Sequence, residues 1–261
     1  MLLRPAFLLL CLAPVPVTQA SITSGFGAVA DVGFFDDCRT LCLRPGGLTD
    51  QTVNGGEFST GTAITLTYNP AQRGFAAASF TGDVFSPVLR SSSRTPVDAG
   101  NAIDAIATAV QGYTYLGAAP ADYSVQVSLS GTVAQPASNS EGVIRGRAAV
   151  YRYENARFST DFSSFILEEV ASEGEVLATA QLFLLPTLDL SQGTLDFTLN
   201  PGDEVYVWMQ LSTKSERGAV VDATNTFDLT FTAGDVSMLG AQVVDGVDPV
   251  NLFADGFEEA D

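Results

Sequence analysis

The reactive side chains of this chain leave few catalytic schemes open. Its 261 residues contain no histidine, which removes Ser-His-Asp and Cys-His catalysis, imidazole acid–base chemistry and the common metal-hydrolase sites. Lys214 is the single lysine, and Leu211 stands three residues before it, so there is no Ser-x-x-Lys motif. A nucleophilic Ser21 at a processed N-terminus stays formally open. The commonest hydrolase mechanisms are therefore excluded.

Paired carboxylates are the catalytic groups that remain. Glycosidases use two of them about 5 to 10 Å apart, and sandwich folds can host this chemistry. Asp196 and Asp228 are each expected to point outward alone from a predicted strand. We therefore predict no catalytic residue and leave enzymatic activity open. The densest acids fall in a turn-like or short helical stretch, where a solvated loop is the simpler interpretation: Glu168, Glu169, Glu173 and Glu175.

Aromatic side chains give a better indication of a binding surface, because rings stack on the apolar faces of sugars. A central strand buried on both sides would carry the same residues as core. Sugar contact and core packing therefore both stay open. The candidate ligand-binding residues are three pairs that share a strand face or flank a turn: Tyr206 with Trp208, Tyr151 with Tyr153, and Tyr113 with Tyr115.

Two cysteines, Cys38 and Cys42, remain once an N-terminal signal is removed. In an oxidising compartment we expect them to form a disulfide. So short a ring adds little loop-closure entropy, so it would shape a local loop. Redox exchange is the alternative, although the spacing is not Cys-x-x-Cys. Zinc would need two further soft ligands that the chain lacks, so no metal or cofactor is predicted.

Aspartate clusters offer weak calcium candidates, because carboxylates in loops suit a hard cation. The clearest are Asp245 and Asp248, near Asn251, and a second cluster joins Asp36 to Asp37. Neither has the spacing of an EF-hand. Capping of turns by aspartate explains both clusters more simply.

Residues 1–20 have the organisation of a cleaved secretory signal. One basic residue, Arg4, precedes an apolar run over residues 6–13, and Ala20 ends a segment that a signal peptidase can read. Two prolines interrupt the run well short of the roughly 20 residues that a membrane anchor needs. We expect a secreted or cell-surface protein, with the periplasm as the alternative, and no membrane span after cleavage.

Composition indicates a folded domain with an acidic surface. The formal net charge of −18 would repel nucleic acid and anionic membranes. Charged residues make up only 16% of the chain and are spread thinly, unlike those of a disordered acidic protein. The expected partners are an extracellular polysaccharide or another surface protein. The oligomeric state is left open.

Alternating apolar residues predict an all-β fold. In residues 202–232 two alternating strands surround a polar turn, with Val205, Val207, Met209 and Leu211 on one inner face. Similar patterns with regular turn residues favour an antiparallel two-sheet β-sandwich of jelly-roll type. The predicted strands cover residues 62–68, 74–84, 123–132, 143–153, 175–185, 194–199, 204–212, 220–232 and, more weakly, 236–244.

One short helix and one loop interrupt this pattern. Asn101 would cap the helix, Asp104 would lie in its first turn, and Gly112 would end it, around an apolar stripe. A Ser/Arg loop is predicted over residues 91–96. The expected organisation is a sandwich domain over 21–244, with a loop-rich part at 21–61 and an acidic tail at 245–261. The stripe consists of Ile103, Ile106, Ala107 and Val110.

Several segments look familiar. They are Gln111-Gly112-Tyr113-Thr114-Tyr115, the hydroxyl-rich strand 124–131, Pro201-Gly202-Asp203 before Val205-Tyr206-Val207-Trp208, and residues 221–226. Together they resemble the extracellular β-sandwich regions of bacterial PEP-CTERM-type exported proteins, over about half the chain. The sorting features of that group, a Pro-Glu-Pro signal, a C-terminal membrane helix and a basic cluster, are missing. The resemblance implies a surface or matrix role and carries over no catalytic residue.

The leading interpretation is a secreted, non-catalytic β-sandwich protein that acts in adhesion or in the extracellular matrix, with weak affinity for carbohydrate. One alternative is a carboxylate-dependent glycosidase or lyase on the same fold. Another is a structural subunit that self-assembles through exposed strand edges. The tail, which contains Phe253 and Phe257, is expected to be an exposed end or a docking segment.

Overall fold

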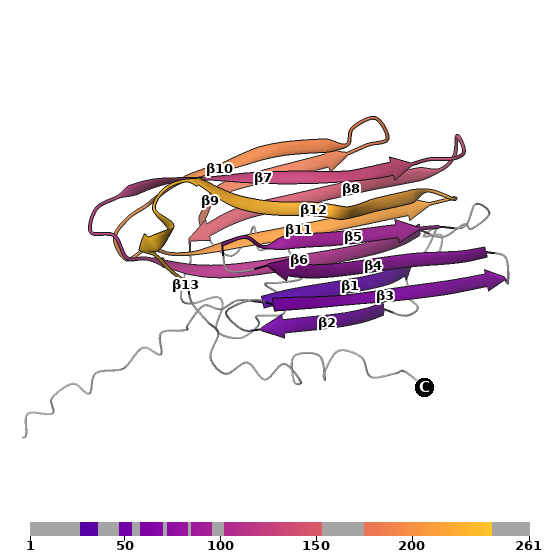
Figure 1. The fold of residues 1–261 in the computed structure, drawn as a ribbon, viewed down its shortest axis with the longest axis horizontal. Helices are drawn as coiled ribbons and strands as arrows, with labels where there is room; N and C mark the ends of the chain where they lie inside the picture. The colour runs from indigo at the N-terminus through magenta and orange to yellow at the C-terminus, as the bar shows by residue number, and fades with distance from the viewer. Residues whose placement is uncertain are drawn as a thin grey trace, which may run out of the picture.

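The computed structural model describes residues 27–35, 47–53, 58–69, 72–82, 85–95, 102–152 and 175–241. They form two antiparallel sheets packed face to face (Figure 1). The predicted all-β sandwich is therefore confirmed. The elements are β1 (Gly27–Phe35), β2 (Gly47–Val53), β3 (Phe58–Asn69), β4 (Gln72–Gly82), β5 (Val88–Arg94), β6 (Ala102–Tyr115), β7 (Ala121–Ala134), β8 (Glu141–Arg152), β9 (Glu175–Leu184), β10 (Leu190–Leu199), β11 (Glu204–Glu216), β12 (Val220–Ala233), the 3-10 helix η1 (Val236–Met238) and β13 (Leu239–Ala241).

Sheet A has the order β2-β1-β6-β11-β8-β9, with β13 also paired to β6, and sheet B has the order β10-β7-β12-β5-β4-β3. Within β5 to β12 the pairs are nested, because β5 pairs with β12, β6 with β11, β7 with β10 and β8 with β9. Folding such a ribbon over itself adds the pairs β12–β7 and β11–β8. This is the strand order of a jelly roll. Strands β1 to β4 widen both sheets beyond β6 and β5.

The core lies between the inner faces of the two sheets. The predicted alternation of β11 is confirmed, since Val205, Val207, Met209 and Leu211 all belong to the core and are at most 4% exposed. Strand β7 contributes its own aliphatic row, which includes Val127. Burial of these side chains on both sheets supplies the hydrophobic free energy that holds the sandwich together.

The predicted helix is wrong, because residues 102–115 form strand β6. Strand β6 lies between β1 and β11, so its backbone hydrogen bonds go to its neighbours. Its buried row is Ile103, Ala105, Ala107 and Ala109, which alternates with period two. Alanine fits either a helix or a strand, so the apolar stripe with helical spacing was coincidental.

The predicted Ser/Arg loop is also wrong, because β5 runs from Val88 to Arg94. Leu89, Ser91 and Ser93 point into the core, and the residues between them point outward. Strand β5 pairs with β12 on one side and with β4 on the other. The inward serines are accepted because hydroxyl partners from sheet A meet them there.

Strands β11 and β12 follow one another but belong to different sheets. A tight turn joins them, in which the Ala219 N–H donates to the Glu216 carbonyl over 3.1 Å. The two central residues, Arg217 and Gly218, have φ values of 50° and 86°, as in a type I′ turn. The predicted strand at 236–244 is reduced to η1 and the short β13 over its first six residues.

Several sequence predictions lie outside the described residues. They concern the signal segment 1–20, the Cys38–Cys42 disulfide, Tyr153, and the calcium candidates Asp36, Asp37, Asp245 and Asp248. The acidic stretch before Glu175 and the tail 245–261 also lie outside them. In the part of the chain that the structure describes, no helix combines the length and hydropathy needed to cross a membrane.

Candidate binding face on the outer side of sheet A

Two of the predicted ligand-binding rings belong to the inner core. Tyr113 is 2% exposed and stacks on Phe85, with ring centroids 5.7 Å apart. Tyr115 is 5% exposed and meets Tyr123 edge to face, and its hydroxyl donates to the Ala119 carbonyl over 2.6 Å. Both rings pack the space between the sheets, which is the core-packing interpretation of this pair.

Three other predicted rings lie on the opposite, outer face of sheet A. Tyr206 and Trp208 alternate along β11 with core residues, and Tyr151 of β8 pairs with Tyr206 in register. The structure thus brings the three rings together, as the sequence indicated. All three are nevertheless buried, at 3%, 1% and 1% exposure. In this conformation none of them offers a ring face to a sugar in solvent.

The outer face becomes open further along the same strands, toward the end of β8 that begins at Glu141. We call this part the open face. Its members come from β8, β9 and β11 and are exposed or half-buried. Directly opposite residues on one face of an antiparallel sheet have Cβ atoms about 4.5–5.5 Å apart, so these side chains form one cluster. The open face consists of Arg145, Arg147, Gln181, Phe183, Gln210, Ser212 and Lys214.

A cation–aromatic pair lies at the middle of the open face. Arg145 is the register partner of both Phe183 on β9 and Ser212 on β11. Its guanidinium carbon lies 5.3 Å from the centroid of the Phe183 ring, which is close enough for a cation–π interaction. Phe183 keeps 39% of its surface exposed. The pair presents an apolar edge beside five N–H donors.

Amide groups flank this pair on the next register position. Arg147 is opposite Gln181 on β9 and Gln210 on β11. An amide side chain offers both a donor and an acceptor, so this row can match either polarity of a hydroxyl group. The sequence analysis missed the open face. The spacing of Arg145 and Arg147 by two residues within a predicted strand of an acidic chain was the available indication.

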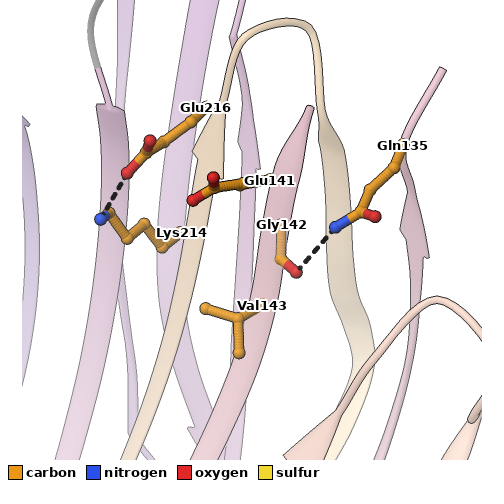
Figure 2. Close-up of a pocket in the computed structure, with 6 residues that line it drawn as sticks. All are labelled: Gln135, Glu141, Gly142, Val143, Lys214 and Glu216. Atoms are coloured by element: carbon orange, nitrogen blue, oxygen red, sulfur yellow. Dashed lines mark hydrogen bonds and ion pairs between the residues drawn. The ribbon is translucent and has the colours of Figure 1, made fainter. Parts of the chain in front are cut away.

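A pocket of about 270 Å³ continues from the open face toward the end of the sandwich (Figure 2). Glu141 and Glu216 are register partners on β8 and β11. Lys214 Nζ lies 2.5 Å from Glu216 Oε1, and Arg217 lies 3.3 Å from Glu141 Oε1. The pocket is lined by Gln135, Glu141, Gly142, Val143, Lys214 and Glu216.

Neighbouring acids hold Lys214 in its charged form. Its hydrogen bond to Glu216 raises the pKa of the Lys214 ammonium above the ordinary value, against the opposite effect of partial burial. Asp104 and Glu141 add smaller electrostatic contributions in the same direction. Opposed glutamates repel each other, so Lys214 and Arg217 also offset the repulsion across this pair of strands. The pocket is therefore a compensated ion-pair cluster.

The carboxyl group best suited to donate a proton lies elsewhere. Burial raises the pKa of Asp228 on β12, and its Oδ1 atom is buried without a hydrogen-bond partner. Its cross-strand neighbours are Ser128 on β7 and Val88 on β5, both in sheet B. Asp196, the other acid expected to point outward alone, accepts a hydrogen bond from Ser124 at 2.7 Å. No second carboxylate is recorded beside Asp228 among the described contacts.

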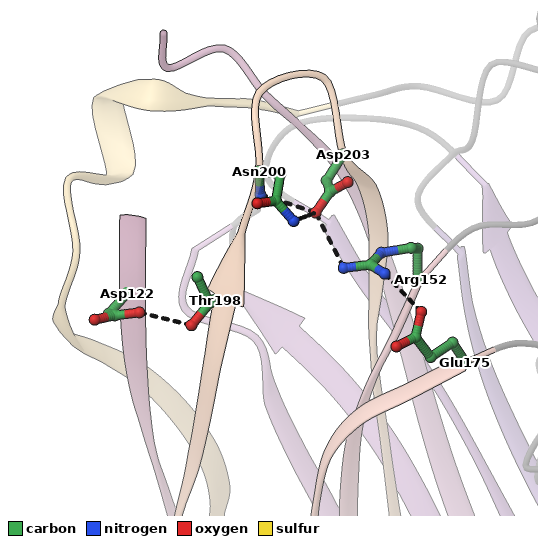
Figure 3. Close-up of polar contacts among 6 residues, drawn as sticks. All are labelled: Asp122, Arg152, Glu175, Thr198, Asn200 and Asp203. Carbon is green, nitrogen blue, oxygen red and sulfur yellow. Dashed lines mark hydrogen bonds and ion pairs between the residues drawn. The ribbon is translucent and has the colours of Figure 1, made fainter. Parts of the chain in front are cut away.

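The opposite end of the sandwich is held by a second polar cluster (Figure 3). Arg152 at the end of β8 pairs with Glu175 of β9 at 2.6 Å and with Asp203 at 3.2 Å. The same oxygen of Asp203 accepts the Asn200 backbone N–H at 2.9 Å. Asn200 to Asp203 form a type II turn in which Gly202 takes a φ of 82°. This cluster ties three strand ends and is explained by structure alone.

Metal binding finds no support in the described part of the chain. No group of three or more histidine, cysteine, aspartate or glutamate residues there is arranged to hold a metal ion. A comparison with models of protein families finds no match for the chain, and a comparison with curated proteins finds none either.

Proposed function

We propose that this protein is a non-catalytic, exported β-sandwich that acts at the cell surface or in the extracellular matrix, where it binds carbohydrate weakly through the open face. The observation that carries the proposal is the Arg145–Phe183 pair on an exposed sheet surface. Export is the expectation from residues 1–20, and the surface or matrix role follows from it.

The chemistry of the open face suits a sugar chain. A saccharide presents hydroxyl groups around a partly apolar ring, so it needs both donors and acceptors beside an aromatic surface. Arg145 and Arg147 supply donors, Gln181 and Gln210 supply both polarities, and Phe183 supplies the apolar contact. A nearly flat sheet surface buries little of a ligand, so we expect low affinity.

The carboxylate-dependent glycosidase stays the second candidate because the pocket holds Glu141 and Glu216 on adjacent strands. Catalysis of this kind needs one carboxyl kept protonated as the acid and one free to act as base or nucleophile. Both glutamates are instead engaged by cations, and Glu141 is 68% exposed. The acid with the raised pKa, Asp228, lies in sheet B. A binding role therefore fits this arrangement better.

Calorimetric titration of the purified protein with the oligosaccharides selected by a glycan panel tests the proposal. We expect saturable binding that Arg145→Ala and Phe183→Ala each weaken by about tenfold, or about 1.4 kcal/mol. Arg94→Ala is the matched control, because Arg94 is an exposed arginine at the end of β5 in sheet B and should leave affinity unchanged.

Two outcomes would overturn the carbohydrate proposal. One is a panel without any binder, and the other is binding that both open-face substitutions leave intact while the fold is preserved. Release of reducing ends that Glu141→Gln or Glu216→Gln abolishes would instead establish the glycosidase.

A further inference from the structure

Strand β10 exposes a row of backbone hydrogen-bonding groups along the free edge of sheet B. The Gly131 N–H donates to the Asp189 carbonyl over 3.2 Å, so Asp189 faces β7. Backbone groups alternate sides along a strand, and the register of β10 with β7 is unbroken. The N–H and C=O groups that therefore face the free edge belong to Leu190, Gln192, Thr194, Asp196 and Thr198.

This edge lacks the features that usually prevent strand addition. Soluble proteins protect edge strands with lysine, proline, bulges or short length. Strand β10 has ten residues, no proline, no lysine, no register shift and a single charge, Asp196. Its neighbour at this side of the molecule, β9, does have a register shift, opposite Val150 and Tyr151. The five side chains of the edge-facing residues of β10 are all exposed.

We propose that β10 pairs antiparallel with β10 of a second copy of this chain, so that sheet B continues across a two-fold axis. A second copy supplies an extended strand of equal length with the same open row, which makes the contact isologous. Centring the axis on Thr194 places Gln192 opposite Asp196 and Leu190 opposite Thr198. An amide then faces each carboxylate, and no two acids oppose each other.

Net charge sets the salt dependence of this pairing. Two copies that each carry a formal charge of −18 repel one another at long range. At physiological ionic strength the Debye length is only about 8 Å, so the repulsion between bodies weakens while the nearly neutral β10 contact remains. The dimer should therefore become more populated as salt is raised, unlike an association held by surface ion pairs.

Light scattering coupled to size exclusion tests the pairing on the purified protein over a range of concentrations, from about 0.05 to about 0.5 M salt. We expect a concentration-dependent dimer that salt favours. Thr194→Pro removes an edge-facing N–H without touching the bonds to β7, so it should weaken dimerisation by about tenfold or more. Thr194→Ala keeps that N–H and should leave the dimer nearly intact.

Amide hydrogen exchange locates the contact independently of any variant. The edge-facing amides of β10 should exchange quickly in dilute protein and at least several-fold more slowly when the dimer is populated. A chain that stays monomeric at high salt and high concentration overturns the proposal. So does a dimer that leaves these amides unprotected, or a monomer whose β10 edge is protected only by another protein.

Discussion

Hydroxyl groups replace aliphatic side chains at one end of the core. Ser91 on β5 donates to the Ala105 carbonyl over 2.9 Å and lies 2.7 Å from the Thr213 hydroxyl of β11. Because the single Ser91 proton is used on Ala105, Thr213 must donate to Ser91. A second link across the sheets joins Thr95 to Ser215 at 2.8 Å. Buried hydroxyls that find such partners cost little and link the two sheets by direction as well as by packing.

Substitution of these hydroxyls should reveal their order in the network. Thr213→Val removes one donor and keeps the side-chain shape, so we expect a loss of about 0.5–1.5 kcal/mol in the free energy of unfolding. Ser91→Ala removes a donor and an acceptor together and should cost more. Urea denaturation of both single variants and the double variant measures the coupling between the two residues. Additive losses would contradict the proposed hydrogen bond.

Asp228 makes a pH-dependent contribution to stability. Burial raises its pKa in the folded protein above the value of an unfolded chain, so the folded state binds this proton more tightly. The stabilisation is complete below the unfolded pKa and is lost as pH rises through the folded pKa. Asp228→Asn should therefore raise the melting temperature at neutral pH and change it little in acid. Equal effects of the substitution at both pH values would contradict this assignment.

At the scale of elements, the turn between β11 and β12 is the connection that moves the chain from sheet A to sheet B. Gly218 has a φ of 86°, where a Cβ atom is strained. Gly218→Ala should therefore reduce the free energy of unfolding by about 1–2 kcal/mol. Arg217→Asn is the comparison, because asparagine tolerates the φ of 50° and only weak ion pairs are lost. Thermal unfolding that ranks the two variants in the reverse order would contradict the turn assignment.

Elements with strong two-residue alternation were predictable, and elements made of small residues were not. Strands β7, β11 and β12 alternate large apolar and polar side chains, so their inner faces followed directly from the sequence. The alanines of β6 and the serines of β5 carry no such contrast. Their strand state depends on neighbours that are distant in sequence, such as β11 and β12.

The candidate site depended on the same long-range information. The sequence placed Tyr206 and Trp208 on one strand face but could not show that this part of the face is buried. Arg145 and Phe183 lie on different strands, and only the register between β8 and β9 brings them together. Residue types indicated a carbohydrate surface, while its location required the pairing of strands.

At the scale of the whole molecule, the nested strand order makes the last long strand essential. Strand β12 lies between β7 and β5, so without it sheet B would separate into two pieces. We expect a chain that ends before Val220 to lose cooperative thermal unfolding and to bind hydrophobic dyes. A synthetic peptide of residues 220–233 added during refolding should restore part of the folded population. A truncated chain that unfolds cooperatively would contradict this view of the closure.

Trp208 is the only tryptophan of the chain, and it lies between β6 and β8 in the interior of sheet A at 1% exposure. All indole fluorescence of the folded protein therefore comes from one fixed place. Its neighbour on the same strand face is Gln210, a member of the open face. The natural emission spectrum can thus report both the opening of this sheet surface, as a shift to longer wavelength, and occupancy of the adjacent side chains, without any attached dye.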